Sequence, residues 1–102
     1  MSHPQISIQY RGLEIASGRS GVFHRFTVTD SHTGQTREVL LYRDVSIKEL
    51  VQANYGCDCD SMVKQIGPEF IRQKFEAGNV NLDESGPLEL DLHFQDFDKP
   101  TK

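Results

Sequence analysis

The spacing of hydrophobic residues changes twice along this chain, and this change constrains the fold more than any other feature. Hydrophobic side chains recur at every second position in several stretches before residue 43 and again over 88–94, but at every third or fourth position between 46 and 78. Period two predicts strands with one buried face, and the longer period predicts helices with one buried stripe. Elements of both kinds must bury these faces against each other. We therefore expect an α+β fold of two layers, in which helices cover one face of an antiparallel or mixed sheet.

The N-terminal part predicts strands over residues 5–10, 22–29 and 36–42. The second and third of these are separated by a short polar stretch in which Gly34 can adopt a positive φ, so they are expected to form a hairpin. Gly12 leaves two interpretations open, namely a turn into a second short strand or a bulge within one bent strand. The sheet is accordingly expected to have four or five strands.

The first expected helix begins at a capping box. Ser46 and Glu49 have the spacing in which the Ser46 hydroxyl caps a backbone N–H and Glu49 reaches back to the cap residue. The expected apolar stripe is Ile47, Leu50 and Val51. Gly56 is placed to end this helix.

A second helix is expected to start near residues 58–61. Gly67-Pro68 should break it, because proline lacks the N–H group that the interior of a helix needs. Pro68 suits the first turn of a helix, so we expect a third helix that ends at Gly78. The middle of the chain therefore predicts two or three short helices.

The C-terminal part predicts one more strand. Residues 88–94 alternate strictly between polar and large apolar side chains, as in a strand with one face in the core. From Gln95 this pattern is lost, and 95–102 is expected to be a frayed tail. The expected order of elements is β-β-β-(β)-α-α-α-β within one small domain over 1–94, because 102 residues leave no room for a second core.

Charge and cysteine content narrow the class of protein. The chain carries 15 acidic and 11 basic residues, for a net charge of −4, which makes nucleic-acid binding an unfavoured alternative. Its longest strongly apolar run, 39–42, is far too short to span a membrane. No secretory signal is visible, and the chain has only 2 cysteines. These features predict a cytoplasmic protein.

Cys57 and Cys59 are the candidates for a metal or thiol-redox site. A structural zinc ion usually takes four ligands, and no second ligand pair with regular spacing is present. The neighbouring aspartates Asp58 and Asp60 would raise a thiol pKa and so oppose redox reactivity. We therefore expect packed or incidental thiols, with no bound metal and no cofactor.

No catalytic set is apparent from residue spacing. His24 lies on the apolar side of a predicted strand, where it is either a base whose pKa is tuned by burial or, more commonly, a core histidine with hydrogen-bond partners. The chain has no Gly-x-Ser-x-Gly nucleophile motif and no phosphate-binding glycine loop. A non-catalytic protein is therefore favoured over an enzyme.

The candidate binding residues are the arginines and aromatic residues of the predicted hairpin. Every basic residue before position 45 is an arginine, and Arg25 and Arg37 are expected on the same outer side. Arginine beside aromatic rings is the composition of a protein interface or of a platform for single-stranded nucleic acid. The candidates are Phe23, Arg25, Arg37, Tyr42 and Arg43. The competing interpretation is a solvated face on which the arginines pair with Glu38, Glu89 and Asp91.

The favoured function is a small cytosolic protein-interaction module, such as an adaptor, an inhibitor or immunity-type protein, or a complex subunit. It would bind another protein through the outer sheet face or an edge strand, and a homodimer is one version of this hypothesis. The sequence does not identify the partner. The first alternative is a nucleic-acid-binding accessory protein that uses the arginine-bearing hairpin. The second is a metal or thiol-redox site at Cys57 and Cys59.

Overall fold

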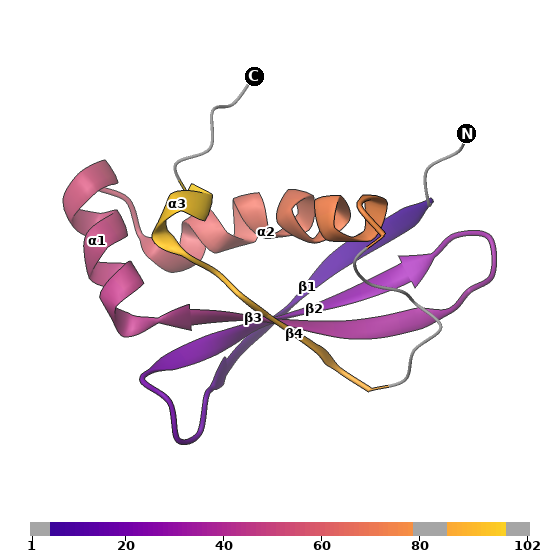
Figure 1. Ribbon diagram of the computed structural model, residues 1–102, viewed down its shortest axis with the longest axis horizontal. Helices are drawn as coiled ribbons and strands as arrows, with labels where there is room; N and C mark the ends of the chain where they lie inside the picture. Colours follow the sequence, from indigo (N-terminus) through magenta and orange to yellow (C-terminus); the bar gives the residue numbers. More distant parts are fainter. Residues whose placement is uncertain (1–4, 79–85, 98–102) are drawn as a thin grey trace.

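A computed structural model describes residues 5–78 and 86–97 of the chain. These residues form a four-stranded mixed sheet with three helices on one side (Figure 1). The elements are β1 (Ile6–Ile15), β2 (Gly21–Asp30), β3 (Thr36–Asp44), α1 (Val45–Tyr55), α2 (Cys59–Glu76), β4 (Leu88–Asp91) and α3 (Phe94–Phe97). The predicted α+β fold is confirmed, although the third helix follows the last strand instead of preceding it. None of the helices in the described ranges is long and apolar enough to cross a membrane.

The sheet has the order β1-β2-β3-β4. The first three strands pair antiparallel, whereas β4 pairs parallel with β3. A parallel pair needs a crossover connection, and α1 and α2 lie within it, on one face of the sheet (Figure 1). The register between β1 and β2 shifts between Tyr10 and Gly12, where Gly12 has φ 124°. The interpretation of β1 as one bent strand with a bulge is therefore confirmed.

The core lies between the sheet and the helices. Strand alternation turns His24, Phe26 and Val28 of β2 toward the helices, and all three are fully buried. Val39 and Leu41 of β3 lie beside them in register. The helices contribute buried side chains to the same cluster, among them Ile47, Val51, Val63, Phe70, Ile71 and Phe75. Two layers with one apolar side each thus form a single core cluster.

The predicted break at Gly67-Pro68 is wrong, since α2 continues through both residues. Apolar side chains before and after Pro68, such as Val63 and Ile71, are buried in the same core cluster. Burial against one sheet holds the two halves of the helix in line despite the missing N–H of Pro68. A Cβ on Gly67 would lie 2.6 Å from Cζ of Phe26, so the glycine lets the helix approach that ring closely.

Helix α1 begins two residues earlier than the capping box predicts. Its N-cap is Asp44, whose Oδ2 accepts hydrogen bonds from the Ser46 backbone N–H at 3.0 Å and the Ser46 hydroxyl at 2.8 Å. The prediction of Ser46 as the cap is therefore wrong. Aspartate is as strong an N-cap residue as serine, which is why Asp44 can take this position. Leu50 is 44 % exposed and does not belong to the buried stripe. The buried residues of α1 are Ile47 and Val51.

The last strand is shorter than predicted. β4 ends at Asp91, and the chain then turns, with the His93 backbone N–H donating to Oδ2 of Asp96 at 2.8 Å. Residues 94–97, most of which the sequence places in a frayed tail, form α3. Phe97 is buried in the core cluster, which holds this turn of helix in place. The rest of the expected tail, 98–102, lies outside the described residues.

Candidate protein-interaction surface

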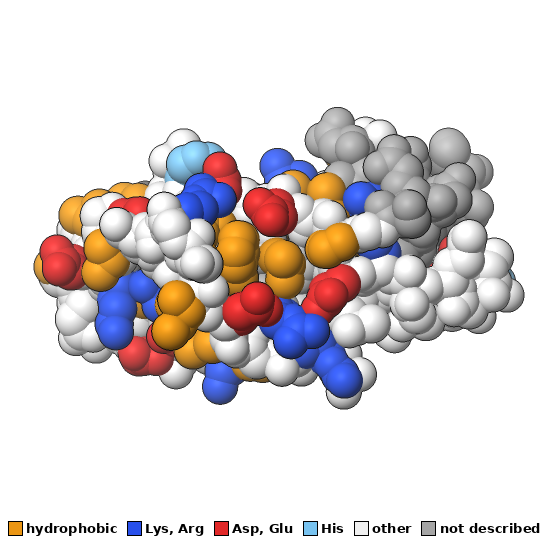
Figure 2. Space-filling model, turned by 90° about the horizontal axis from the view of Figure 1, so that it is seen from below, with side chains coloured by type: hydrophobic (Ala, Val, Ile, Leu, Met, Phe, Trp, Pro, Cys, Tyr) orange, Lys and Arg blue, Asp and Glu red, His pale blue; other side chains and the backbone are white. Residues whose placement is uncertain are grey.

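The sheet face opposite the helices is covered by none of the described elements (Figure 1). Phe23 of β2 and Tyr42 of β3 are direct cross-strand partners on this face, with ring centroids 5.7 Å apart and planes at 65°. Leu40 lies two positions along β3, opposite Arg25. Figure 2 shows hydrophobic side chains gathered in the middle of this view, with charged side chains around them. We call this uncovered side of the sheet the outer face, with Phe23, Arg25, Leu40 and Tyr42 at its centre.

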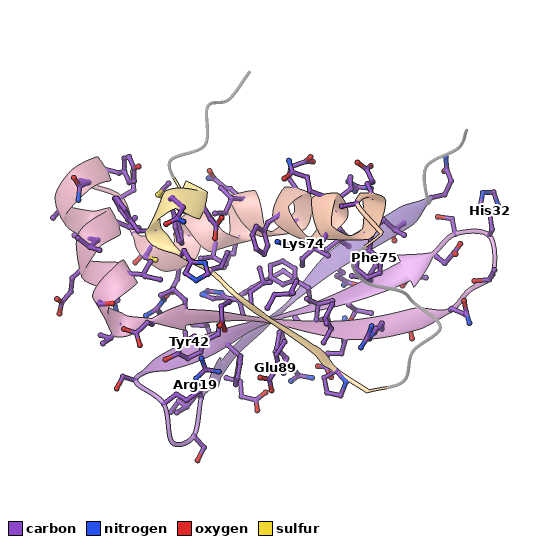
Figure 3. All side chains as sticks on the ribbon, in the orientation of Figure 1. Arg19, His32, Tyr42, Lys74, Phe75 and Glu89 are labelled. Atoms are coloured by element: carbon purple, nitrogen blue, oxygen red, sulfur yellow. The ribbon has the colours of Figure 1, made fainter. Side chains whose placement is uncertain are left out.

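Arg19, from the loop between β1 and β2, stacks on the Tyr42 ring. Its Cζ lies 3.6 Å from the ring centroid, and Nη2 lies 3.6 Å from Oδ1 of Asp91. The Tyr42 hydroxyl donates to Oδ1 of Asp44 at 3.0 Å. Figure 3 shows Arg19 and Tyr42, together with Glu89, on the side of the sheet away from the helices. The cation–π contact and the hydroxyl bond orient Tyr42, which is only 6 % exposed.

Gly21 allows the Arg19 loop to lie close to β3. A Cβ at this position would lie 2.2 Å from the carbonyl oxygen of Arg43 and 2.9 Å from the Tyr42 hydroxyl oxygen. Only glycine fits such a close approach. Sequence reasoning missed Arg19 as a member of this surface, because residues 17–21 resemble a flexible loop. The position of Gly21 at the start of a strand is the signal that could have indicated a close contact there.

Arg25 forms ion pairs on the outer face. Its Nε donates to Oε2 of Glu38 at 2.7 Å, and Nη2 also contacts this carboxylate. The Glu14 carboxylate lies 3.7 Å from the same Nε. Arg25 pairs with Glu38, and Arg19 pairs with Asp91. Ion pairs of this kind are what the interpretation of a solvated face predicts. Such exposed pairs contribute little to stability and can be exchanged for contacts with a partner.

Arg37 and Arg43 lie on the other face of the sheet, so the expectation that Arg37 shares a side with Arg25 is wrong. The reason is register, because Val28 faces Arg37 while Arg25 faces Leu40. Arg37 is 8 % exposed, and its Nε donates to the Gly86 carbonyl oxygen at 3.0 Å. Of the five candidate residues, Phe23, Arg25 and Tyr42 share the outer face, and the arginines do not converge on one platform.

Arg43 belongs to a buried polar cluster that joins the sheet to the start of α2. Nη2 of Arg43 donates to Oδ1 of Asp60 at 2.6 Å. The same oxygen lies 3.1 Å from Nε2 of His24, and Nδ1 of His24 lies 3.2 Å from the Tyr10 hydroxyl. A neutral His24 with its proton on Nε2 satisfies both bonds, with Tyr10 donating to Nδ1. The expectation of a core histidine with hydrogen-bond partners is confirmed.

The hydrogen-bonded chain Tyr10–His24–Asp60–Arg43 resembles the relay of a catalytic acid–base site. The environment of these residues nevertheless favours a structural role. Burial lowers the pKa of His24, and Asp60 only partly opposes this. Burial also raises the pKa of Asp60, but the hydrogen bond and charge of Arg43 outweigh it, so the pKa lies below its usual value. Burial raises the pKa of Tyr10, which keeps its hydroxyl protonated and a poor nucleophile. His24 is 0 % exposed, so no substrate reaches it in this conformation.

The two cysteines lie in different environments. Cys57 is exposed, with its thiol 3.3 Å from the Tyr55 carbonyl oxygen, whereas Cys59 is buried at the start of α2. Burial raises the pKa of the Cys59 thiol to about 11, which opposes the thiolate that metal binding and redox chemistry need. Within residues 5–78 and 86–97, no group of three or more His, Cys, Asp or Glu side chains could hold a metal ion.

A shallow hollow runs along the outer side of α1. It is lined by Val45, Lys48, Glu49, Gln52 and Ala53, all from this one helix. Ligand sites usually bring together polar groups from several elements. The hollow therefore offers little to orient a small molecule, and the outer face remains the stronger candidate.

Comparisons of the chain with protein-family models, with curated proteins and with solved structures find no match. Function must therefore be inferred from the surfaces described above. On the outer face, register and contacts place five carboxylates around the aromatic pair, against the two arginines Arg19 and Arg25. These carboxylates belong to Glu14, Glu38, Asp44, Glu89 and Asp91. The surface thus combines an apolar centre with an acidic surround.

Proposed function

We propose that this chain is a small cytosolic, non-catalytic protein-interaction module that binds a partner protein through the outer face. The observation that carries the proposal is the Phe23–Tyr42 aromatic pair on a sheet face that no described helix or strand covers. Within this pair Phe23 is half-buried, and Tyr42 lies beneath the side chain of Arg19. Aromatic residues and arginine at the centre of a patch, with charges around them, are the usual make-up of an interaction hot spot. An adaptor, an inhibitor or a complex subunit would use such a face in the same way.

Charge defines the kind of partner. The chain carries −4 overall, and carboxylates outnumber arginines around the aromatic pair. A partner with a basic surface would meet the least repulsion and would associate faster at low salt. A reducing compartment is supported by free thiols, of which Cys57 is exposed.

The test is capture of a partner by variants with matched charge changes. One variant combines Phe23→Thr with Glu89→Lys on the outer face, and the control carries Glu49→Lys on the outer side of α1. Tagged chains are incubated with extract of the source cells, retained proteins are identified by mass spectrometry, and the purified partner is titrated calorimetrically.

We expect the wild-type chain and the Glu49→Lys control to retain the same basic partner. The outer-face variant should bind it at least about tenfold more weakly, a loss of about 1.4 kcal/mol. Added salt should weaken wild-type binding. Equal binding by the outer-face variant would overturn the proposal, and so would binding of single-stranded DNA at about 50 mM salt with no protein partner retained.

A further inference from the structure

The free edge of β1 differs between its two halves. β1 is the first strand in the sheet order, so its outer backbone groups have no strand partner among the described residues. The Ser31 backbone N–H donates to the Gln5 carbonyl oxygen at 2.8 Å, so Gln5 and every second residue up to the bulge turn their backbone toward β2. The backbone groups of Ile6, Ile8 and Tyr10 therefore point outward.

Side chains of α2 cover the first half of this edge, from Ile6 to Tyr10. Nη1 of Arg72 donates to the outward carbonyl oxygen of Ile6 at 3.3 Å. Nζ of Lys64 lies over the Tyr10 ring, 5.3 Å from its centroid. Long cationic side chains and the bulge after Tyr10 are common means by which proteins keep a sheet edge from pairing.

The second half of the edge, Gly12–Ile15, has no such protection among the described residues. The Ala16 backbone N–H donates to the Gly21 carbonyl oxygen at 3.2 Å, so alternation turns the backbone N–H and C=O groups of Leu13 and Ile15 outward. The side chains of these two residues are 52 % and 80 % exposed. Glu14 lies between them, with its side chain on the outer face and 56 % exposed.

We propose that the edge at Leu13–Ile15 binds an extended segment of a partner protein, which adds a strand to the sheet beside β1. The segment that fits has apolar residues beside Leu13 and Ile15 and a lysine or arginine beside Glu14. Outward backbone groups supply the hydrogen bonds, and the alternating side chains supply the specificity. This site adjoins the outer face, because Glu14 lies opposite Phe23 across the strands, but its hydrogen bonds come from the backbone at the edge of β1.

A second copy of this chain fits the edge less well. The antiparallel register that pairs Leu13 with Ile15 of the second copy also places the two Glu14 side chains opposite each other. Like charges directly opposite destabilise a strand pair. Charge complementarity therefore favours a basic segment from another protein.

The probe is a short synthetic peptide of alternating valine and lysine with blocked ends. Binding is followed by backbone NMR shifts and by amide hydrogen exchange of Leu13 and Ile15. One control peptide has the same composition in scrambled order. Another is methylated on its central valine nitrogens and cannot donate to the edge. A third replaces lysine by glutamate.

Two variants test the edge on the protein side. Ile15→Pro removes an outward N–H without removing a bond to β2, and the double variant Leu13→Ser with Ile15→Ser removes the apolar contacts. The matched control is Leu50→Ser, which makes the same apolar-to-serine change at an exposed position of α1, away from the edge. Circular dichroism and urea unfolding show whether each variant remains folded.

We expect the valine–lysine peptide to slow exchange at Leu13 and Ile15. Methylation, scrambling, the glutamate peptide and either edge variant should each weaken binding by about tenfold or more. The Leu50→Ser variant should bind the peptide as the wild-type chain does. Equal binding of the methylated peptide, or shifts confined to other strands, would overturn the proposal. A dimer in sedimentation that Ile15→Pro dissociates would replace the partner segment by a second copy.

Discussion

The arginines on the two faces of the sheet differ in burial and in the partners they contact. On the helix-covered face, Arg43 is 4 % exposed and donates to a single carboxylate oxygen of Asp60, which His24 also contacts. On the outer face, the side chain of Arg25 is 42 % exposed and lies between the Glu14 and Glu38 carboxylates. A buried charge needs its partner because water cannot replace it, whereas an exposed charge does not. The first face therefore holds the fold together, and the second remains open to exchange partners.

The aromatic residues show the same contrast. Phe26 is 0 % exposed, and its ring packs against the Tyr10 ring and lies close to Gly67 of α2. Phe23, in contrast, is half-buried on the outer face. Burial on one side of a strand thus contributes stability, while partial burial on the other leaves apolar surface that a partner could cover. Four measurements can break or sharpen this contrast.

The largest expected effect is that of Phe26→Ala. Truncating a fully buried phenylalanine removes its apolar contacts and leaves a cavity, for a loss of about 4 kcal/mol in the free energy of unfolding. The matched change Phe23→Ala should cost about 1 kcal/mol, because this ring is already partly in water. Urea unfolding of both variants gives the two values. Similar losses would mean that the outer face is as well packed as the core.

Asp60→Asn should have the next largest effect. It leaves Arg43 buried without its counter-charge, which should cost about 3 kcal/mol. Glu38→Gln makes the same chemical change beside the exposed Arg25 and should cost about 0.5 kcal/mol. The difference in unfolding free energy between the two variants measures how far burial strengthens an ion pair. Equal values would show that the Asp60 cluster is effectively solvated.

The pH dependence of stability tests the same cluster. Burial holds the pKa of folded His24 below 6.5, so the unfolded chain binds its proton first as the pH falls. Stability should therefore decrease below about pH 6.5, by at most about 1.4 kcal/mol per pH unit from this group. The lowered pKa of Asp60 adds a further loss below about pH 4.

His24→Gln isolates the histidine contribution. Its unfolding free energy should change little between pH 7 and about pH 5, whereas a variant with the exposed turn residue changed, His32→Gln, should keep the wild-type slope. Urea unfolding at a series of pH values checks both expectations. A His24→Gln variant with an unaltered slope would show that His24 titrates normally in the fold.

The smallest expected effect belongs to the Arg25–Glu38 pair. A double-mutant cycle with Arg25→Ala and Glu38→Ala should give a coupling free energy of about 0.5 kcal/mol, which decreases in high salt. This pair is the readiest on the outer face to exchange its partners. A coupling above about 2 kcal/mol, insensitive to salt, would contradict the view of this face as exchangeable.

Much of the fold follows from local pattern. The alternation in β2 and β3, the burial of Ile47 and Val51 in α1 and the left-handed turn of Gly56 that ends this helix were each predictable from residues close in sequence. The prediction failed at Gly67-Pro68, where the local signal for a break is opposed by burial of both halves of α2 in one core. It also failed at Phe97, which is buried by residues distant in the chain.

The candidate site was predictable only in part. Phe23 and Tyr42 lie together on the outer face because they are opposite each other in the β2–β3 hairpin, and alternation along each strand turns both side chains to the same side. Arg37 was assigned to the wrong side, because the choice of partner residue across the hairpin sets the face and the sequence leaves that register open. The contact of Arg19 with Tyr42 and that of Asp60 with Arg43 were not predicted. The local pattern around Arg19 indicates only a loop, and that around Asp60 indicates only the start of a helix.

The amino-acid order alone determined which segments are strands and helices and which side of most of them is apolar, because these properties depend on neighbours within one or two turns. Only the tertiary structure decided that α2 crosses β2 so that Asp60 meets His24 and Arg43. Those contacts join residues up to 36 positions apart, and their geometry exists only after water has left the space between helix and sheet. The same packing left the outer face and the end of β1 uncovered by any described element, and there we expect partners to bind.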